Sequence, residues 1–113
     1  MRKTFEVMSS DGVMTYFVSF ELVSDKLYVG CNCQAGSFGK WCRHKTQLVL
    51  GDLSCLRDNI QSNDAYEVLE WVKNTKIAQL VGEIQMAEIE MQKAKVRKEK
   101  ATKQLERVSR EGA

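Results

Sequence analysis

Three of the four cysteines and the only histidine of this 113-residue chain form one short pattern, Cys31-x-Cys33-x8-Cys42-x-His44. Thiolate and imidazole are ligands that zinc prefers, and four of them close a tetrahedral site. Because the protein fills all four positions, none stays open for water or substrate. The pattern therefore predicts one structural Zn²⁺ per chain, bound by Cys31, Cys33, Cys42 and His44.

The spacing also indicates how the ligands are placed. Residues two apart on a β-strand point to the same face, so Cys31 and Cys33 are expected to present their sulfurs side by side. Glycines in the spacer allow the chain to reverse. Cys42 and His44 are then expected at the start of a helix, where backbone N–H groups favour a thiolate. A domain of roughly sixty residues, such as the one expected before the long helix, buries only about 60% of the surface that its unfolded chain exposes. A metal is therefore expected to stabilise it.

Three other interpretations of the cysteines compete with zinc. A Cys-x-Cys redox pair leaves Cys42 and His44 without a role. A catalytic Cys–His pair needs one cysteine and a separated histidine, not three clustered thiols. Iron–sulfur sites that use histidine usually take two of them. Cys55 lies outside the pattern and is expected to be a buried, inert thiol.

The residues before the pattern are typical of three short strands, expected over 3–8, 13–23 and 26–32. Asp11-Gly12 supplies hairpin chemistry for the first turn, and Ser24-Asp25 makes the second. The second segment is rich in β-branched and aromatic residues, as strands are.

Helices are expected after the pattern. The first runs from about residue 41 to Gly51, a typical residue just beyond a helix end. A second short helix is expected over 52–60, and the polar residues 61–64 can cap the next helix. The predicted fold class is α+β: a small antiparallel sheet of about three strands plus a helix, forming a ββα-type zinc module, followed by a long C-terminal helix.

Residues 65–110 contain no proline and one glycine, which predicts one long helix. From Ile77 to Val108 a 3–4 spacing runs over ten positions, and all but Lys98 are apolar. More than four heptads of this kind indicate a coiled coil. The alternative is a helix that folds back onto the head or onto its neighbour. The residues expected to form the coiled-coil seam are Ile77, Leu80, Ile84, Met91, Leu105 and Val108.

Two domains are expected, a zinc-binding domain over 1–62 and a coiled-coil helix over 63–113. The net charge of +2 is unevenly distributed. Residues 63–92 hold six Asp/Glu against two Lys/Arg, whereas residues 93–113 hold eight Lys/Arg against three Asp/Glu. Antiparallel pairing would lay the acidic segment against the basic one, so we expect an antiparallel homodimer.

The chain shows no membrane or secretion signal. It has no run of about eighteen apolar residues, and its first residues lack an apolar h-region. Four cysteines in an unsecreted chain favour metal or free thiols over disulfides. We expect an intracellular protein, cytoplasmic or nuclear if eukaryotic, with no membrane partner.

The ligand pattern resembles the SWIM-type zinc finger, whose signature is Cys-x-Cys, a variable spacer and Cys-x-His. All four ligand positions match, an apolar segment over 27–29 precedes them, and a helix-like segment over 44–50 follows. The small-residue spacer over 35–40 is similar to that of bacterial members. The resemblance covers about residues 13–51 and implies a ββα zinc module that binds nucleic acid or protein. It does not extend to the C-terminal helix.

The predicted function is a non-enzymatic interaction module. An enzyme is not expected, because the only histidine is assigned to the metal and no nucleophile–base pair stands out. A nucleic-acid surface would use Lys40, Trp41, Arg43 and Lys45 around the zinc, together with the basic segment 93–110. Against this, a tryptophan beside a ligand is more often core, and a basic run on a coiled coil is usually a solvated face. The alternative is a protein–protein adaptor, or a subunit of a larger complex, that does not contact DNA or RNA.

Overall fold

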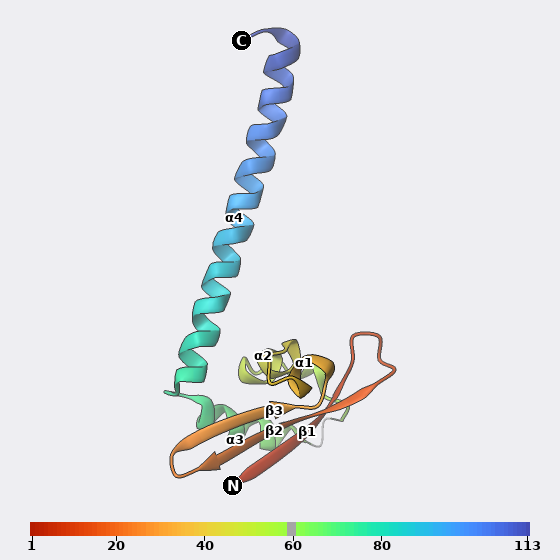
Figure 1. The fold of residues 1–113 in the computed structure, drawn as a ribbon, viewed down its shortest axis with the longest axis vertical. Helices are drawn as coiled ribbons and strands as arrows, with labels where there is room; N and C mark the ends of the chain where they lie inside the picture. Colours follow the sequence, from red (N-terminus) through yellow and green to blue (C-terminus); the bar gives the residue numbers. More distant parts are fainter. Residues whose placement is uncertain (59–60) are drawn as a thin grey trace. The chain divides into compact units, whose positions relative to one another are not determined.

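The computed structural model describes residues 1–58 and 61–113, which form two compact units (Figure 1). Unit 1, here called the head, is Met1–Ala78, and unit 2 is Gln79–Ala113. The α+β class predicted from the sequence is confirmed. The described elements are β1 (Arg2–Met8), β2 (Thr15–Val23), β3 (Lys26–Cys31), α1 (Gln34–Ser37), α2 (Arg43–Val49), the 3-10 turn η1 (Leu53–Cys55), α3 (Ser62–Val72) and α4 (Lys76–Glu111).

The three strands form an antiparallel sheet in the order β1-β2-β3 (Figure 1). Phe5 on β1 lies opposite Val18 on β2, and Val18 lies opposite Cys31 on β3. In the second turn Ser24 and Asp25 both have positive φ, 49° and 65°. Tight two-residue hairpin loops require this conformation, which Asp adopts more readily than most residues. All three predicted strands are therefore confirmed, with ends shifted by no more than two residues.

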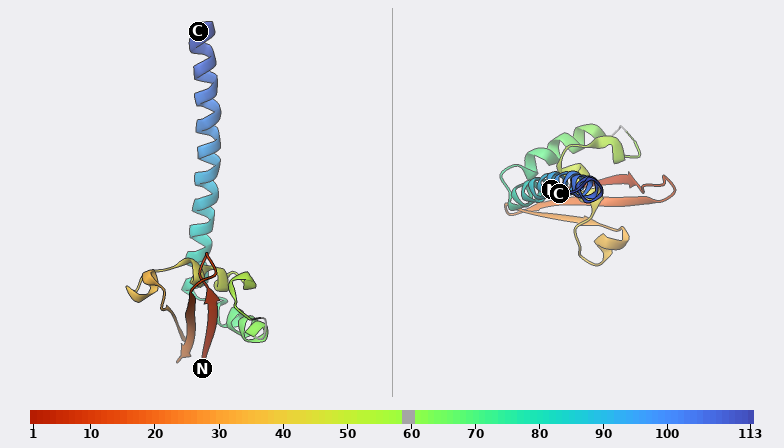
Figure 2. Two further views of the ribbon diagram at one scale, coloured as in Figure 1. Left: turned by 90° about the vertical axis from the view of Figure 1, so that its right-hand side faces the viewer. Right: turned by 90° about the horizontal axis from the view of Figure 1, so that it is seen from above.

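One face of the sheet forms the core of the head. Phe5, Val7, Val18 and Phe20 are fully buried, and the rings of Phe5 and Phe20 meet edge to face at 5.8 Å. Helix α3 runs along this sheet (Figure 2) and contributes the buried Val68. Burying an aliphatic or aromatic side chain stabilises a fold by about 1.5–3 kcal/mol, so these residues supply much of the driving force for folding.

Arg57 and Gln61 cover part of the outer edge of β1. The N–H of Arg57 donates to the carbonyl of Glu6 at 3.0 Å. The side chain of Gln61 donates to the carbonyl of Thr4 at 2.7 Å and accepts from the N–H of Glu6 at 3.1 Å. Gln61 was expected to help cap a helix. It occupies the N-cap position of α3 but makes no capping bond, because its amide binds β1.

The short helix expected over 52–60 is reduced to the single turn η1 among the described residues. Asp52 caps this turn by accepting from the N–H of Ser54 at 3.0 Å. Leu56 is already extended, which ends the turn. Residues 59 and 60 of the expected helix lie outside the described residues.

The prediction of one uninterrupted helix over 65–110 is wrong. Helices α3 and α4 are separated by Lys73–Thr75, where Asn74 has a φ of 65°. Asn is the residue other than glycine that most readily ends a helix in this conformation. Thr75 then begins α4: its Oγ1 accepts from the N–H of Ala78 at 3.4 Å. The compact units divide after Ala78, so α3 lies in the head although it follows the boundary expected at residue 62.

Helix α4 has 36 residues and is about 54 Å long at about 1.5 Å per residue. Every residue from Glu83 onward is exposed. Despite its length, α4 is too polar to cross a bilayer, and no other helix in the described part of the chain meets that requirement either.

Candidate metal centre

The four predicted ligands come together at the junction of three elements. Cys31 ends β3, Cys33 is the N-cap residue of α1, Cys42 is the N-cap residue of α2, and His44 lies in the first turn of α2. All four side chains are buried, and one donor atom from each lies within 4.8 Å of the others. This is a compact quartet of soft and borderline donors that could hold a metal ion.

Asn32, the residue between the first two cysteines, fixes the end of β3. Its N–H donates to the carbonyl of Phe17 at 3.2 Å, and its Oδ1 accepts from the N–H of Phe17 at 2.7 Å. This pairing extends the sheet by one residue beyond Cys31. The sequence pattern gave Asn32 no role, because its partner on β2 is known only once the strand register is known.

The chain turns after Cys33 through α1, a helical turn that the sequence pattern did not predict. The N–H of Gly36 donates to Cys33 Sγ at 3.3 Å. A Cβ on Gly36 would lie 2.1 Å from the carbonyl oxygen of Cys31, closer than any real contact. Glycine is therefore required here for close approach of two backbone segments, which brings Cys33 back toward Cys31.

His44 has the environment of a ligand rather than of an ordinary core histidine. Its Nδ1 lies 3.9 Å from Cys31 Sγ. Its Nε2 is buried and has no hydrogen-bond partner within residues 1–58 and 61–113. The ring of Tyr16 packs against the imidazole with centroids 5.3 Å apart. A buried ring nitrogen without a hydrogen-bond partner is unusual, and a metal bound at Nε2 would supply the missing partner.

Cys31, Cys33 and His44 differ in their electrostatic environments. Burial raises the pKa of Cys31 to about 12, and the neighbouring thiols Cys33 and Cys42 add to the rise. Burial acts in the same direction on Cys33, but hydrogen bonds, first from the N–H of Gly36, outweigh it and lower the pKa of Cys33. Burial, with a smaller contribution from Arg43, lowers the pKa of His44 and keeps the imidazole neutral. Neutral imidazole and thiolate are the forms that bind metals, and a divalent cation would offset the cost of three adjacent thiolates.

The predicted contact residues around the quartet have different environments. Lys40 is exposed. Arg43 is also exposed, and its Nη2 donates to Ser10 Oγ at 2.7 Å. Lys45 is only 5% exposed and its Nζ donates to the carbonyl of Lys40 at 3.1 Å. Burial thus removes Lys45 from the set of cations that solvent or a ligand can reach.

Trp41 lies partly at the surface, with 39% of its area exposed. Its Nε1 donates to Thr46 Oγ1 at 2.7 Å, and the Lys45 ammonium lies 5.4 Å from its ring centroid. The indole therefore has a structural role in orienting α2 and still presents surface to solvent.

The remaining predicted residues are not members of the quartet. Cys55 is buried, as expected, and burial together with the charge of Asp52 raises the pKa of its thiol. Of the seam residues on α4, Ile77 is half-buried. The exposed ones are Leu80, Ile84, Met91, Leu105 and Val108.

Comparisons with protein-family models, with curated proteins and with solved structures find no match for this chain. Support for a metal site therefore comes from the geometry of the quartet, which could hold a metal ion and is compatible with a zinc finger.

Proposed function

We propose that the head is a SWIM-type structural zinc module, that the chain is not an enzyme, and that it self-associates through α4 to present binding surfaces for nucleic acid. The observation that carries the proposal is the closed quartet of three thiols and one imidazole. When bound, Zn²⁺ would join β3 to α2 and stabilise a small head. The only imidazole of the chain belongs to this quartet, which leaves none for general acid–base chemistry.

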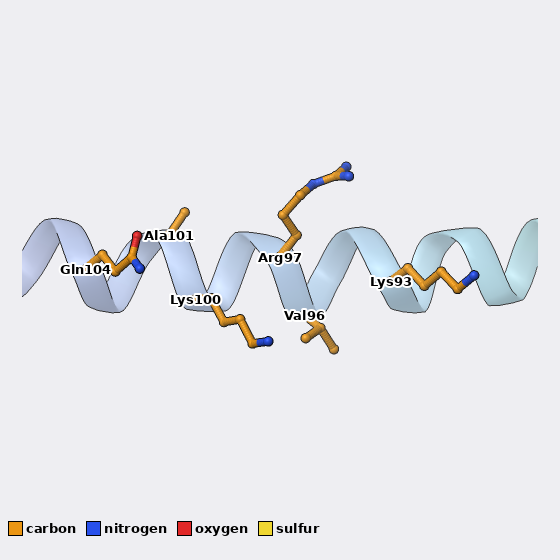
Figure 3. Close-up of a pocket in the computed structure, with 6 residues that line it drawn as sticks. All are labelled: Lys93, Val96, Arg97, Lys100, Ala101 and Gln104. Atoms are coloured by element: carbon orange, nitrogen blue, oxygen red, sulfur yellow. The ribbon is translucent and has the colours of Figure 1, made fainter.

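Two exposed cationic regions support a nucleic-acid role. On the head, Lys40 and Arg43 flank the partly exposed Trp41. On α4, Lys93, Arg97 and Lys100 line one side of the helix (Figure 3). Phosphate contacts of Lys and Arg supply most of the affinity of non-specific nucleic-acid binding. We therefore expect modest affinity with weak sequence preference.

The test is fluorescence anisotropy with short single- and double-stranded oligonucleotides from low to physiological salt. Each phosphate contact that is lost should reduce the salt slope by about one unit. Lys40→Glu/Arg43→Glu should weaken binding. The matched control is Arg2→Glu/Lys26→Glu, because these exposed cations begin β1 and β3, whereas Cys31 ends β3. Absence of binding at low salt would remove the nucleic-acid role and leave the zinc module.

A second function, protein–protein adaptor, is favoured by the face of the sheet opposite the core. Phe17 on β2 is 44% exposed and Tyr28 on β3 is 56% exposed. Exposed aromatic residues are enriched where proteins bind proteins. Phe17→Ser/Tyr28→Ser should then abolish capture of a native partner in nuclease-treated extract, while oligonucleotide binding stays unchanged.

A further inference from the structure

We propose that two copies of this chain pair through α4 as an antiparallel coiled coil in which Met91 packs against the partner's Ala94. The inference deepens the self-association part of the proposed function and depends on it, but it does not depend on zinc or nucleic acid. In this pair the exposed apolar stripe of α4 packs against α4 of a second copy.

The stripe is available for pairing. Leu80, Ile84, Met91 and Leu105 follow one another at heptad positions and are all exposed in the single chain. Met91 and Leu105 expose 71% and 70% of their area. An exposed helix with an apolar stripe gains most of its stability by burying that stripe against another element.

Packing sizes favour the antiparallel register. With Met91 opposite the partner's Ala94, the same alignment places Ile84 opposite the partner's Ala101 and Leu80 opposite the partner's Leu105. Each small alanine is thereby matched by a larger side chain, as close packing requires. Lys98 falls opposite the partner's Ala87, where its aliphatic stem can cover the methyl group while its ammonium reaches solvent.

Charges beside the seam select the same register. Glu88 and Glu90 flank the seam on its acidic half, and Lys95 and Arg97 flank it on its basic half; all four are exposed. In the antiparallel pair Glu88 lies near the partner's Lys95, and Glu90 lies near the partner's Arg97. Two-fold symmetry forms each ion pair twice, and such flanking pairs set the orientation of coiled coils.

A parallel, in-register pair is disfavoured by the same residues. It would stack Ala87, Ala94 and Ala101 on their own copies, leaving the centre underpacked. It would also place Lys98 against the partner's Lys98 within the seam and Glu83 near the partner's Glu88. The opposite face of α4 offers no rival stripe, because Lys93 interrupts its apolar residues Ile89 and Val96 and later positions are cationic.

Glu88→Lys distinguishes the two orientations in the full-length zinc-loaded chain. In the antiparallel register the new ammonium lies near the partner's Lys95, so the dimer dissociation constant should rise about tenfold. In the parallel register the substitution removes the repulsion by Glu83, so the dimer should tighten. Sedimentation equilibrium gives the constant, and Glu99→Lys, the same charge change on an outward position, is the matched control that should leave it unchanged. The double variant Glu88→Lys/Lys95→Glu should restore dimerisation only in the antiparallel register.

Photo-cross-linking then fixes the register directly. With p-benzoylphenylalanine in place of Leu80, peptide mapping should find cross-links to the partner near residue 105. Cross-links near the partner's residue 80, or tightening by Glu88→Lys, would overturn the inference while leaving self-association intact. A wild-type monomer at tens of micromolar would overturn both the inference and the self-association on which it rests. Zinc content and oligonucleotide binding are measured separately, so neither result would remove the zinc module.

Discussion

The head and α4 hold their conformations in different ways. In the head, Phe5 pairs with Val18 and Cys31 meets His44, so the contacts join residues far apart in the sequence. In α4 the backbone bonds join residues four apart, and side chains from Glu83 onward are exposed. The head is therefore held together by specific contacts between distant residues, whereas α4 is held together by a repeated local pattern.

Loss of the metal should cause the largest difference in stability between the head and α4. Structural zinc contributes about 10–16 kcal/mol in small finger domains, more than a domain of this size gains from its core. Cys33→Ser should therefore abolish zinc binding and collapse the amide dispersion of the head in ¹H–¹⁵N spectra, while the signals of α4 stay helical. Cys55→Ser is the control and should retain one zinc per chain. Full zinc occupancy in Cys33→Ser would contradict the site.

A core truncation should have the next largest effect, again only in the head. Phe20 is fully buried, so Phe20→Ala should destabilise the head by about 3–5 kcal/mol. Leu105→Ala removes a similar apolar side chain from α4, where it is 70% exposed, and should cost less than about 0.5 kcal/mol in dilute samples. Urea denaturation is followed by tryptophan fluorescence for the head, where Trp41 and Trp71 both lie, and by circular dichroism at 222 nm for α4. Equal losses from the two variants would mean that Leu105 is buried in solution.

Gly36→Ala should loosen the metal centre without removing a ligand. The new Cβ would collide with the carbonyl of Cys31 and displace the N–H that donates to Cys33. Displacing such a supporting contact usually lowers metal affinity by about 10- to 100-fold. Competition with a chromophoric chelator measures the change. Phe38→Ala, at an exposed position of the same turn, should leave the affinity within about twofold.

The glycine in α4 should behave in the opposite sense. Gly82 lies inside the helix, and a Cβ added there would meet no atom within 4 Å among the described residues. Gly82→Ala should therefore stabilise α4 by about 0.5–1 kcal/mol, because glycine loses more backbone entropy on helix formation. Thermal melting followed by circular dichroism at 222 nm checks this. A lower melting temperature would show that close packing at this position requires glycine.

The sequence predicted the structure best where the chemistry of the side chains, or the alternation of apolar and polar residues, indicates the local structure. Three thiols and an imidazole at close spacing predicted a ligand set, and the structure brings Cys31, Cys33, Cys42 and His44 together. The strands could be predicted equally well, because Phe5 and Val7 alternate with polar residues.

Other features could not be predicted from the sequence. The break between α3 and α4 uses Asn74, a residue that occurs within helices as well as at their ends. Lys45 was expected at the surface, but its burial under Trp41 depends on how α2 docks. Gln61 was assigned to a helix cap, whereas its amide fits the edge of β1. For Gln61 the decisive contact is a tertiary one that local sequence does not encode.

The covered edge of β1 also bears on aggregation. An exposed strand edge presents unpaired N–H and C=O groups that can template pairing with another chain. The bonds from Arg57 and Gln61 occupy such groups on β1. At the other side of the sheet α1 approaches Cys31, which shortens the open length of β3. A refolding chain that lost either cover would expose a longer template, so solubility during folding should depend on residues outside the strands themselves.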